Sequence, residues 1–531
     1  GLGDVYKRQM NTFDKDLCSV QEARDLARAG ERAAQEFATF SQEQVDAILK
    51  SMKEAAEKFS VCLAKAAVEE TGFGTVADKA YKNHAAGTLL YEEIKDEKTV
   101  GIIAEDTTKG TLDVAEPVGL VLGIIPSTNP TSTVIFKAMV ALKSRNAIVF
   151  APHPAAAECT KKAAGMMSRA AEAAGAPKGI ISCVSTPTMA STNELMHADE
   201  VSLIIATGGP GMVKAAYSSG KPAIGVGAGN SPAYIERSAD VKKAVSQIIA
   251  SKTFDNGTIC ASEQSIICEE INEAEVIAEL KAQGGYFMSE EETAKVCGLL
   301  FKGGGHAMNA KFVGRKPQVI AEAAGFTVPH STTVLIGRQN GVGAGNPLSF
   351  EKLTTVLAFY TVKDWEEACH LSIELLQNGI GHTMSIHTNN RDIVLKFAAK
   401  PASRILVNTG GSQGGTGIST GLPISFTLGC GTFGGSSVSE NVSPKHLLNI
   451  KKVAYGLKDV TTLLAEDTSF SHPELEEPLD ACLTEKPVKA SQPSEGKTDN
   501  SSMKDFSAAE LSELAEHIWA TCLLYTSPSP R

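Results

Sequence analysis

The feature that most constrains the fold is a series of short apolar, β-rich segments that alternate with alanine-rich helical segments. The apolar segments include VGLVLGIIP (118–126), NAIVFAP (146–152), GIISCVS (179–185) and EVSLIIATGG (200–209), and an alanine-rich helical segment occupies 155–174. Alternation of this kind is typical of a parallel sheet covered by helices. The sequence therefore predicts an α/β fold.

A second α/β series runs over residues 230–429 and is long enough for a second domain. Its strand-like segments are ASEQSIICEE (261–270), TVLIG (333–337), TTVLAFYTV (354–362), HTMSIHT (382–388) and SRILVN (403–408). Ahead of both series, residues 19–71 repeat Ala, Leu, Ile and Phe at three- and four-residue spacing, which predicts amphipathic helices.

The composition excludes several classes of protein. With 531 residues, 43% of them hydrophobic and 21% charged, the chain fits a large globular enzyme of two or three domains. Its longest apolar run, 118–126, is about half of the ~20 residues that cross a bilayer, so no membrane span is predicted. The net charge of −11, without any Lys/Arg-rich block, argues against a nucleic-acid partner.

The eleven cysteines are scattered, with no C-x-x-C pair and no tight Cys/His cluster. This pattern predicts neither a metal site nor a disulfide scaffold, and it favours a reducing, cytoplasmic setting.

Cys260 is the one cysteine whose neighbours suit a nucleophile. An isolated cysteine is usually a buried structural residue, and this is the alternative role for Cys260. In FDNGTIC (254–260), Asn256 and Gly257 predict a turn that would leave the Cys260 N–H exposed. Such an N–H can donate to an oxyanion, and local dipoles can lower the pKa of the thiol.

Asn129 follows the predicted strand that ends at Pro126 and precedes a predicted helix that begins near Pro130. This position places the Asn129 amide at the carboxyl edge of the sheet, where ligands bind in α/β folds. Simple capping of the helix explains Asn129 about equally well.

A glycine-bearing turn, with Thr207, Gly208, Gly209 and Gly211, follows the strand SLIIA (202–206) and precedes another helix. A helix N-terminus in this context can hold a phosphate group. Because tight turns need glycine anyway, the glycines alone are weak evidence.

Six motifs appear in a consistent order over about residues 21–458. They are PSTNPTSTVIFK (126–137), GVGAGNSPAYI (225–235), FDNGTICASEQ (254–264), NPLSFEKLTTVLAFY (346–360), GIGHTMSIHT (379–388) and LGCGTFGGSSVSENVSPKHLLNIK (428–451). Together they resemble the CoA-acylating aldehyde dehydrogenases, which make acetyl-CoA or propionyl-CoA. The resemblance implies the aldehyde dehydrogenase fold, with a Rossmann-like cofactor domain, an α/β catalytic domain and a small oligomerisation hairpin.

The resemblance also implies domain limits. The NAD-binding domain would span 10–229, with oligomerisation strands near 108–118, and the catalytic domain would span 230–429. Residues 430–460 would return to the cofactor and oligomerisation region, with 438–447 as a second candidate for the hairpin. A homodimer or homotetramer is expected.

Site residues follow from the same resemblance. Cys260 matches the catalytic nucleophile, Asn129 the oxyanion-hole amide, and Glu351 the glutamate that holds the nicotinamide ribose. The remaining cofactor-binding candidates are Thr207, Gly208, Gly209, Gly211, Ile125, Pro126, Pro152 and His153. A second interpretation of His153 is that it only shapes the cofactor loop.

Two positions depart from the hydrolytic branch of the superfamily. Hydrolytic members carry a glutamate that activates water, and Val226 stands in its place. Ala151 stands where hydrolytic members have a lysine that contacts the adenosine ribose, so NAD is expected and NADP is not excluded.

The implied reaction joins a small aldehyde to CoA. The Cys260 thiolate attacks the aldehyde, Asn129 and the Cys260 N–H hold the oxyanion, hydride leaves for the nicotinamide, and CoA takes the acyl group. Acetaldehyde and propionaldehyde are both open as substrates, and so is the physiological direction. His382 and His387 could assist CoA deprotonation, but a structural role is favoured.

The ends of the chain differ from the rest. GLGDVYKRQ (1–9) and LLYTSPSPR (523–531) are interpreted as non-native, and 461–505 as a flexible linker rich in Pro, Ser and Lys. Residues 506–522 predict a short amphipathic helix with a capping box at Ser507 and Glu510.

This helix resembles the peptides that carry enzymes into bacterial microcompartments, where shell or cargo proteins would be its partners. The alternatives are a functionless tail, or the first helix of a truncated domain in a bifunctional aldehyde-alcohol dehydrogenase. For the whole chain, a hydrolytic aldehyde dehydrogenase and a non-catalytic cargo protein are the rival functions.

Overall fold

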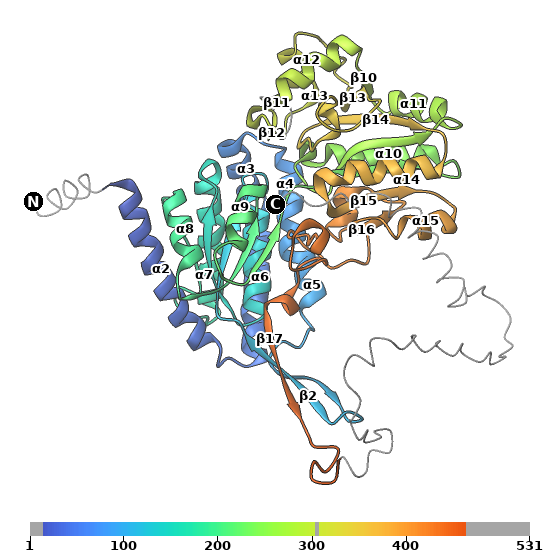
Figure 1. Ribbon diagram of the computed structural model, residues 1–531. Helices are drawn as coiled ribbons and strands as arrows, with labels where there is room; N and C mark the ends of the chain where they lie inside the picture. Colours follow the sequence, from blue (N-terminus) through green and yellow to red (C-terminus); the bar gives the residue numbers. More distant parts are fainter. Residues whose placement is uncertain (1–13, 303–306, 464–531) are drawn as a thin grey trace, which may run out of the picture. The chain divides into compact units, whose positions relative to one another are not determined.

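Two parallel sheets form the centre of the computed structural model, which describes residues 14–302 and 307–463 (Figure 1). The first sheet has the order β5-β4-β3-β6-β7, and each pair of neighbours is parallel. Its strands are β3 (Leu120–Ile125), β4 (Ala147–Pro152), β5 (Ile181–Cys183), β6 (Val201–Thr207) and β7 (Ala223–Val226). The strand order reverses between β3 and β6, and ligands bind at such reversals in α/β folds.

The helices of this part pack around the five-stranded sheet. They are α2 (Lys15–Phe37), α3 (Gln42–Thr71), α4 (Val76–His84), the π-helical turn η1 (Ala85–Leu89), α5 (Leu90–Ile94), α6 (Pro130–Lys143), η2 (Pro154–Ala156), α7 (Ala157–Ala173), α8 (Met189–His197) and α9 (Pro210–Tyr217). A capping box between Ser41 and Gln44 starts α3, and Gly72 in the left-handed conformation ends it. Every residue of α6 is buried, so this helix lies inside the core.

The second sheet has seven parallel strands in the order β10-β13-β14-β9-β8-β15-β16. They are β8 (Ser231–Ile235), β9 (Glu263–Glu269), β10 (Gly285–Phe287), β13 (Val334–Arg338), β14 (Val356–Val362), β15 (Gly381–His387) and β16 (Ala402–Val407). Successive residues of a strand face opposite layers: Ile266 belongs to the core beside α10 (Val241–Thr253), and Ile267 belongs to the core beside α14 (Trp365–Leu376). Because helices cover both faces of this sheet, its strands need near-continuous apolar sequences.

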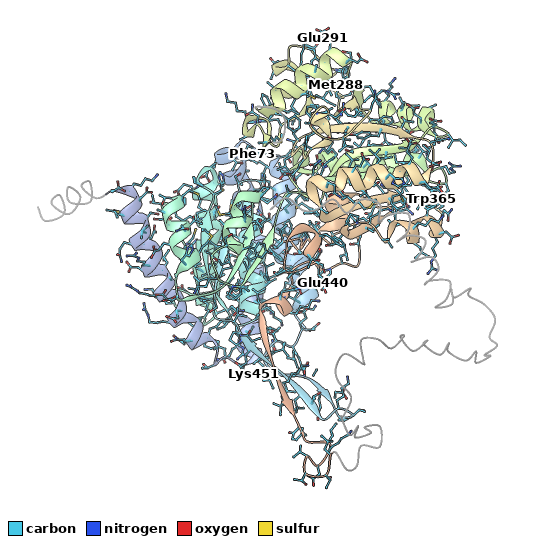
Figure 2. All side chains as sticks on the ribbon, in the orientation of Figure 1. Phe73, Met288, Glu291, Trp365, Glu440 and Lys451 are labelled. Carbon is cyan, nitrogen blue, oxygen red and sulfur yellow. The ribbon has the colours of Figure 1, made fainter. Side chains whose placement is uncertain are left out.

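Shorter elements connect the strands of the second sheet or follow its last strand, β16. They are η3 (Phe254–Gly257), α11 (Glu273–Ala282), α12 (Glu290–Leu300), β11 (Phe301–Lys302), β12 (Ala307–Met308), η4 (Ala310–Phe312), α13 (Pro317–Ala323), η5 (Pro347–Ser349), η6 (Gln377–Gly379), α15 (Arg391–Phe397), α16 (Gly411–Gly415), η7 (Thr432–Gly434) and η8 (Pro444–Leu447). Figure 2 labels Met288 and Glu291 where β10 leads into α12, and Trp365 at the start of α14.

A third sheet has three strands in the order β1-β2-β17. These strands are β1 (Gly101–Asp106), β2 (Thr111–Pro117) and β17 (Leu448–Ala454). Of the described residues, 105–111 and 453–463 belong to a compact unit of their own, in which the Tyr455 N–H donates to the Gly110 carbonyl over 2.9 Å.

The structure confirms the predicted α/β fold. The apolar segments of both series form strands β3, β4, β5, β6, β9, β13, β14, β15 and β16, and 19–71 forms α2 and α3. The second hairpin candidate was misplaced, because 438–447 contains η8 and the strand beside β2 begins only at Leu448. The domain limits at 10–229, 230–429 and 430–460 stay predictions.

Other predictions fall outside the described residues. The two non-native ends, the helix at 506–522 and the linker beyond residue 463 belong to this group. Within the described ranges, none of the helices is both long and apolar enough to cross a bilayer.

Candidate active site

A cavity of about 360 Å³ lies where β3 and β6 end, at the reversal of strand order. It is lined by the segments that follow β3 and β6, by the end of β7 at Val226, and by residues of the second α/β series. The lining includes Pro126, Thr128, Asn129, His153, Thr207, Gly208, Gly209, Val226, Thr258, Cys260, Glu351 and Phe426. Phe73, which Figure 2 labels, also lines this cavity. The cavity therefore brings together most of the predicted site residues.

Another hollow, of about 740 Å³, contains none of the predicted site residues. It lies at the carboxyl ends of β13 and β14 and is lined by Arg338, Tyr360, His370 and several glutamates. Cys260 and Asn129 lie elsewhere, so the smaller cavity is the candidate active site.

The turn before Cys260 has an unusual backbone. Asp255 and Asn256 both adopt left-handed conformations, with φ of 51° and 53°, and Gly257 follows with φ of 79°. Asp and Asn tolerate this region better than other non-glycine residues, and such outliers concentrate at functional sites. The predicted turn ahead of Cys260 is confirmed as η3.

Gly229 packs directly against the cysteine loop, which is the segment 258–262 between η3 and β9 that carries Cys260. A Cβ atom added to Gly229 would lie 2.0 Å from the Cys260 carbonyl oxygen, so a side chain has no room there. The Gly229 N–H donates to Glu351 Oε1 over 3.0 Å. Gly229 therefore contacts two predicted site residues: it packs against the Cys260 carbonyl, and its N–H is hydrogen-bonded to Glu351.

The Cys260 thiol has a raised pKa, which corrects the expectation that local dipoles lower it. Burial raises the pKa to about 12, and the charge of Glu351 raises it further. The Arg404 guanidinium and the Cys260 N–H act in the opposite direction but are outweighed. The thiol is therefore protonated at neutral pH.

Glu351 shares this environment. Burial raises the pKa of its carboxyl group to about 7, although the Gly229 N–H and the ammonium of Lys252 favour the charged form. Glu351 consequently changes charge near neutral pH, inside the same cavity as Cys260.

Asn129 does not cap its helix through its side chain. It occupies the N-cap position of α6, but its side chain makes no capping hydrogen bond. Instead, Asn129 Nδ2 donates to the Thr258 carbonyl over 2.9 Å, two residues before Cys260. The capping explanation is thus not supported, and the amide faces the cysteine loop.

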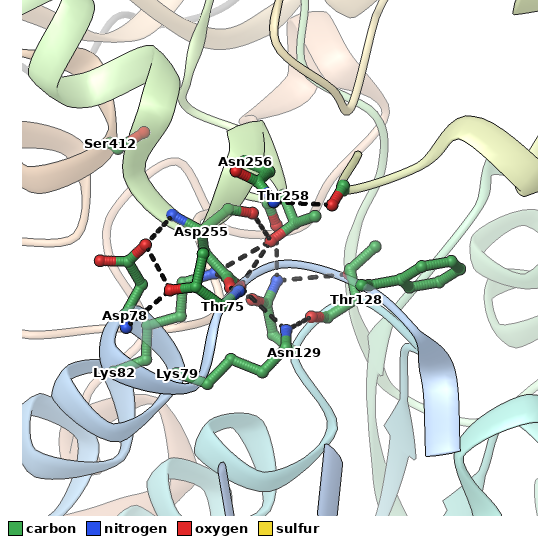
Figure 3. A network of polar contacts seen from close by, with 12 residues as sticks. Thr75, Asp78, Lys79, Lys82, Thr128, Asn129, Asp255, Asn256, Thr258 and Ser412 are labelled. Carbon is green, nitrogen blue, oxygen red and sulfur yellow. Dashed lines mark hydrogen bonds and ion pairs between the residues drawn. The ribbon is translucent and has the colours of Figure 1, made fainter. Parts of the chain in front are cut away.

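A buried ionic network, which sequence reasoning missed, holds this part of the site (Figure 3). Lys79 and Lys82, on α4, place their Nζ atoms 2.9 Å and 2.5 Å from Asp255 Oδ2. Lys82 Nζ also donates to Asn129 Oδ1 over 2.7 Å. These contacts join residues more than forty positions apart, so no local pattern in the sequence could have revealed them.

Asp255 fits against the turn before α4. The Thr75 N–H donates to Asp255 Oδ1 over 2.8 Å, and a Cβ atom on Gly74 would lie 1.7 Å from that oxygen. Burial alone would raise the pKa of Asp255, but Lys82 and Lys79 outweigh it and lower the pKa. The carboxylate is therefore charged at neutral pH.

The glycine turn after β6 is open on the cavity side. Gly209 and Gly211 would each meet nothing within 4 Å if a Cβ atom were added. Thr207, Gly208 and Gly209 line the cavity, whereas Gly211 is not among the lining residues. The space above the N-terminus of α9 can accommodate a ligand group.

Of the four other predicted cofactor-binding residues, two line the cavity and two do not. Pro126 and His153 line the cavity, whereas Ile125 and Pro152 face each other as parallel neighbours at the ends of β3 and β4 and are not among the lining residues. Lys137, inside α6, was not predicted as a site residue. Its Nζ donates to the carbonyls of Ile124 and Ile205. Lys137 therefore links β3 to β6 at the reversal of strand order.

His382 and His387 are both buried in β15, and neither is among the lining residues of the cavity. His382 Nδ1 lies 2.8 Å from Thr383 Oγ1. Burial lowers the pKa of His387 to about 4, and burial also lowers that of His382 well below its usual value. Both rings are neutral at physiological pH.

Comparison with known proteins identifies the family. The sequence pattern of the aldehyde dehydrogenase family matches residues 9–286, more than half of the 531-residue chain. The chain belongs to the aldehyde dehydrogenase family.

Similar aldehyde dehydrogenases include the bifunctional aldehyde-alcohol dehydrogenase AdhE of Escherichia coli K12, 48% identical over 82% of this chain and 50% of that protein. The chain thus spans about half the length of this curated relative. An acetylating aldehyde dehydrogenase from Geobacillus thermoglucosidasius has a solved structure with a TM-score of 0.83 and 52% identity, covering 84% of this chain and 99% of that one.

A more distant solved structure is a propionaldehyde dehydrogenase from the fucose-utilisation microcompartment of Clostridium phytofermentans. It has a TM-score of 0.73 and 28% identity, covering 81% of this chain and 96% of that one. All three comparisons agree with the predicted aldehyde dehydrogenase fold.

In this aldehyde dehydrogenase, Val226 ends β7, is only 2% exposed and lines the cavity near Cys260. Its aliphatic side chain supplies no carboxylate at that point. Across the described ranges, no group of three or more His, Cys, Asp or Glu side chains is placed to hold a metal ion.

Proposed function

We propose that this aldehyde dehydrogenase oxidises a short-chain aldehyde, acetaldehyde or propionaldehyde, to the acyl-CoA with NAD or NADP. The observation that carries the proposal is Cys260 in a cavity that also holds the Asn129 amide and Glu351, with Val226 where a base for water would stand. The acetylating activity in the name of the Geobacillus relative supports it.

The chemistry begins at the Cys260 sulfur. Its thiolate forms a bond to the carbonyl carbon, and the carbonyl oxygen becomes an oxyanion that Asn129 Nδ2 and the Cys260 N–H would stabilise. Loss of hydride from that carbon leaves a thioester on Cys260. The CoA thiolate then attacks the thioester carbon, and the Cys260 thiolate leaves.

Water competes with CoA for the same thioester. Hydrolysis needs a base that takes a proton from water as it attacks. Val226 cannot do this, and Glu351 is held by the Gly229 N–H. Transfer to CoA is therefore favoured over hydrolysis.

The open turn after β6 suits a dinucleotide. When bound, NAD would supply a hydride acceptor and a positively charged ring. The backbone of Gly208 and Gly209, at the N-terminus of α9, would face the pyrophosphate, and Glu351 would hold the nicotinamide ribose. Pro126 and His153 would border the same space.

The test is a product assay on the full chain. Acetaldehyde or propionaldehyde is supplied with NAD or NADP, with and without CoA, and reduced cofactor and carbon products are measured. We expect acyl-CoA and reduced cofactor from the wild type and none from Cys260→Ala. Acid as the product would show a hydrolytic enzyme, and no product in any combination would exclude the proposal.

Assembly and location form a further part of the proposal. Ile102 on β1 and Ile450 on β17 are 54% and 40% exposed, which supports a homodimer or homotetramer through this sheet. Light scattering of the purified chain measures this, and a monomer would contradict it.

The microcompartment relative supports a cargo role for the segment 506–522. Deleting residues 506–522 should leave aldehyde oxidation intact while abolishing co-purification with shell proteins. Unchanged co-purification would exclude the role.

A further inference from the structure

The orientation of the Asn129 amide is set by its contacts. Asn129 Oδ1 lies 2.7 Å from Lys82 Nζ, while Asn129 Nδ2 donates to the Thr258 carbonyl over 2.9 Å and to Thr128 Oγ1 over 3.2 Å. An ammonium group has donors and no acceptor, so only the amide oxygen can face Lys82. The donor end is thereby turned toward the loop that carries Cys260.

We propose that Lys82 is a positioning residue that acts through Asn129: it keeps the donor end of the amide, and not C=O, on the side of the Cys260 loop, where a developing oxyanion would replace Thr128 Oγ1, the more distant of the two present acceptors. This inference rests on the proposed function, because it assigns the second residue of that oxyanion site. Lys82 is not among the residues lining the cavity, so it contacts no reacting atom. An amide flipped by 180° would present its oxygen to the oxyanion and repel it.

Lys82 is itself held rigidly. Its side chain is 1% exposed, and its three donors are matched by Asn129 Oδ1, Asp255 Oδ2 at 2.5 Å and Thr258 Oγ1 at 3.2 Å. An ammonium with all three donors satisfied has one stable position. Burial lowers the pKa of Lys82 to about 8, and the Asp255 carboxylate opposes this shift.

Lys79 offers a matched control on the same helix, one turn earlier. Its side chain is 3% exposed and its Nζ lies 2.9 Å from the same Asp255 oxygen. Its other contact is the Thr128 carbonyl and not the Asn129 amide. Replacing Lys79 thus removes a buried ammonium from the same carboxylate but leaves the amide oxygen paired.

The experiment is a double-mutant cycle on the full chain. Lys82→Met, Lys79→Met, Asn129→Ala and Lys82→Met with Asn129→Ala are compared in the single-turnover rate of cofactor reduction, cofactor affinity and thermal unfolding. Loss of one oxyanion donor lowers the rate by about 10²–10³-fold, so we expect that loss from Asn129→Ala. Lys82→Met should lower the rate at least tenfold, with unchanged cofactor affinity.

Two comparisons separate positioning from general stability. In the Asn129→Ala background, Lys82→Met should have no further effect on the rate, because the amide it positions is gone. Lys79→Met should lower the unfolding temperature about as much as Lys82→Met while changing the rate less than threefold. If Lys82→Met does not fold, Lys82→Met with Asp255→Asn, measured against Asp255→Asn alone, replaces it.

Three results would overturn the inference: equal rate losses from Lys79→Met and Lys82→Met, a Lys82→Met effect that persists undiminished beside Asn129→Ala, or a wild-type rate for Lys82→Met. Each requires an active wild-type enzyme. Failure of the proposed function would instead appear as a wild type that makes no acyl-CoA.

Discussion

The pKa of the Cys260 thiol is set by the surroundings of that residue. A pKa of about 12 leaves only a minute fraction of thiolate at neutral pH, although the proposed chemistry needs the thiolate. A resting thiol of this kind resists oxidation and alkylation. In the proposed reaction, the positive nicotinamide ring of a bound cofactor would favour the thiolate.

Replacing Glu351 by Gln should make Cys260 more reactive in the free enzyme. The Glu351 carboxylate raises the pKa of the thiol, so its removal lowers that pKa and increases the thiolate fraction at pH 8, by roughly several-fold. The rate of iodoacetamide labelling of the Cys260 peptide, measured by mass spectrometry, tests this. Exposed Cys18 provides the internal reference.

The pH profile of labelling sharpens the same prediction. Thiolate increases with pH, but Glu351, with a pKa of about 7, becomes charged over the same range and opposes the increase. Labelling of the wild type should therefore rise less than tenfold per pH unit near pH 7, and that of the variant a full tenfold. Slower labelling of the variant would contradict the charge coupling.

Gly229→Ala should disrupt the cysteine loop. The added Cβ would lie 2.0 Å from the Cys260 carbonyl oxygen, and relieving such an overlap costs about 1–3 kcal/mol. Chemical denaturation measures the loss of stability, and the product assay should show a loss of activity. Gly298→Ala is the control, because its Cβ would meet nothing within 4 Å. Equal effects of the two variants would refute the packing argument.

At the scale of elements, helix α4 and the turn η3 are joined by charge. Asp255→Asn would leave Lys79 and Lys82 buried without a carboxylate, and breaking a buried pair in this way costs about 3–5 kcal/mol. Urea unfolding should show this loss. Glu57→Gln, at the surface pair with Lys53, should change stability little. A similar small effect from Asp255→Asn would contradict the network.

The ion pairs of Asp255 with Lys79 and Lys82 also make the free energy of unfolding depend on pH. Because folding lowers the pKa of Asp255, its stabilisation is present above the unfolded pKa of about 3.9 and is lost as pH falls through the lower folded value. Acid unfolding of the wild type should include this component, and that of Asp255→Asn should lack it.

Local sequence pattern predicted the elements well where they are buried and periodic. The strand at 118–126 and the helices at 19–71 carry their own signal, so β3, α2 and α3 could be found without coordinates. Short β7 and β8, which flank the glycine-rich segment 227–229, carry too little pattern. The π-helical turn η1 was not predicted either; within it Gly87 packs so closely on α3 that an added Cβ atom would lie 2.6 Å from that of Ala56.

The candidate site was predictable only in part for a related reason. Cys260, Asn129 and Glu351 stand in motifs, so sequence could name them. Lys82 and Asp255 act through contacts made only after folding, and their pattern resembles any charged helix and turn. The raised pKa of Cys260 likewise depends on burial, which single-sequence reasoning assigned the wrong direction.

For the molecule as a whole, the cavity lies at the reversal of strand order in the first sheet, and its wall includes Cys260 from the loop that leads into β9. Ligand binding should therefore stabilise the whole described fold. At a concentration of one hundred times Kd, a nucleotide adds about 2.7 kcal/mol to the free energy of unfolding. Thermal unfolding with NAD and with NADP should show a rise in Tm for at least one of them.

Gly209→Leu is the control for nucleotide binding. Its side chain would enter open space, so the variant should fold, but it would occupy the region above the N-terminus of α9. The nucleotide-dependent rise in Tm should disappear. A rise as large as that of the wild type would place the nucleotide elsewhere.

The contact between Lys82, Asn129 and Asp255 also limits how this protein can change over evolutionary time. Loss of Asp255 leaves Lys82 without its carboxylate, loss of Lys82 leaves the Asn129 amide oxygen without its donor, and loss of Asn129 removes one acceptor of Lys82. Single substitutions should therefore be selected against. Neutral drift at these positions then requires two compensating changes at once. Among descendants of this sequence, the three residues should persist together while activity is retained and disappear together once it is lost.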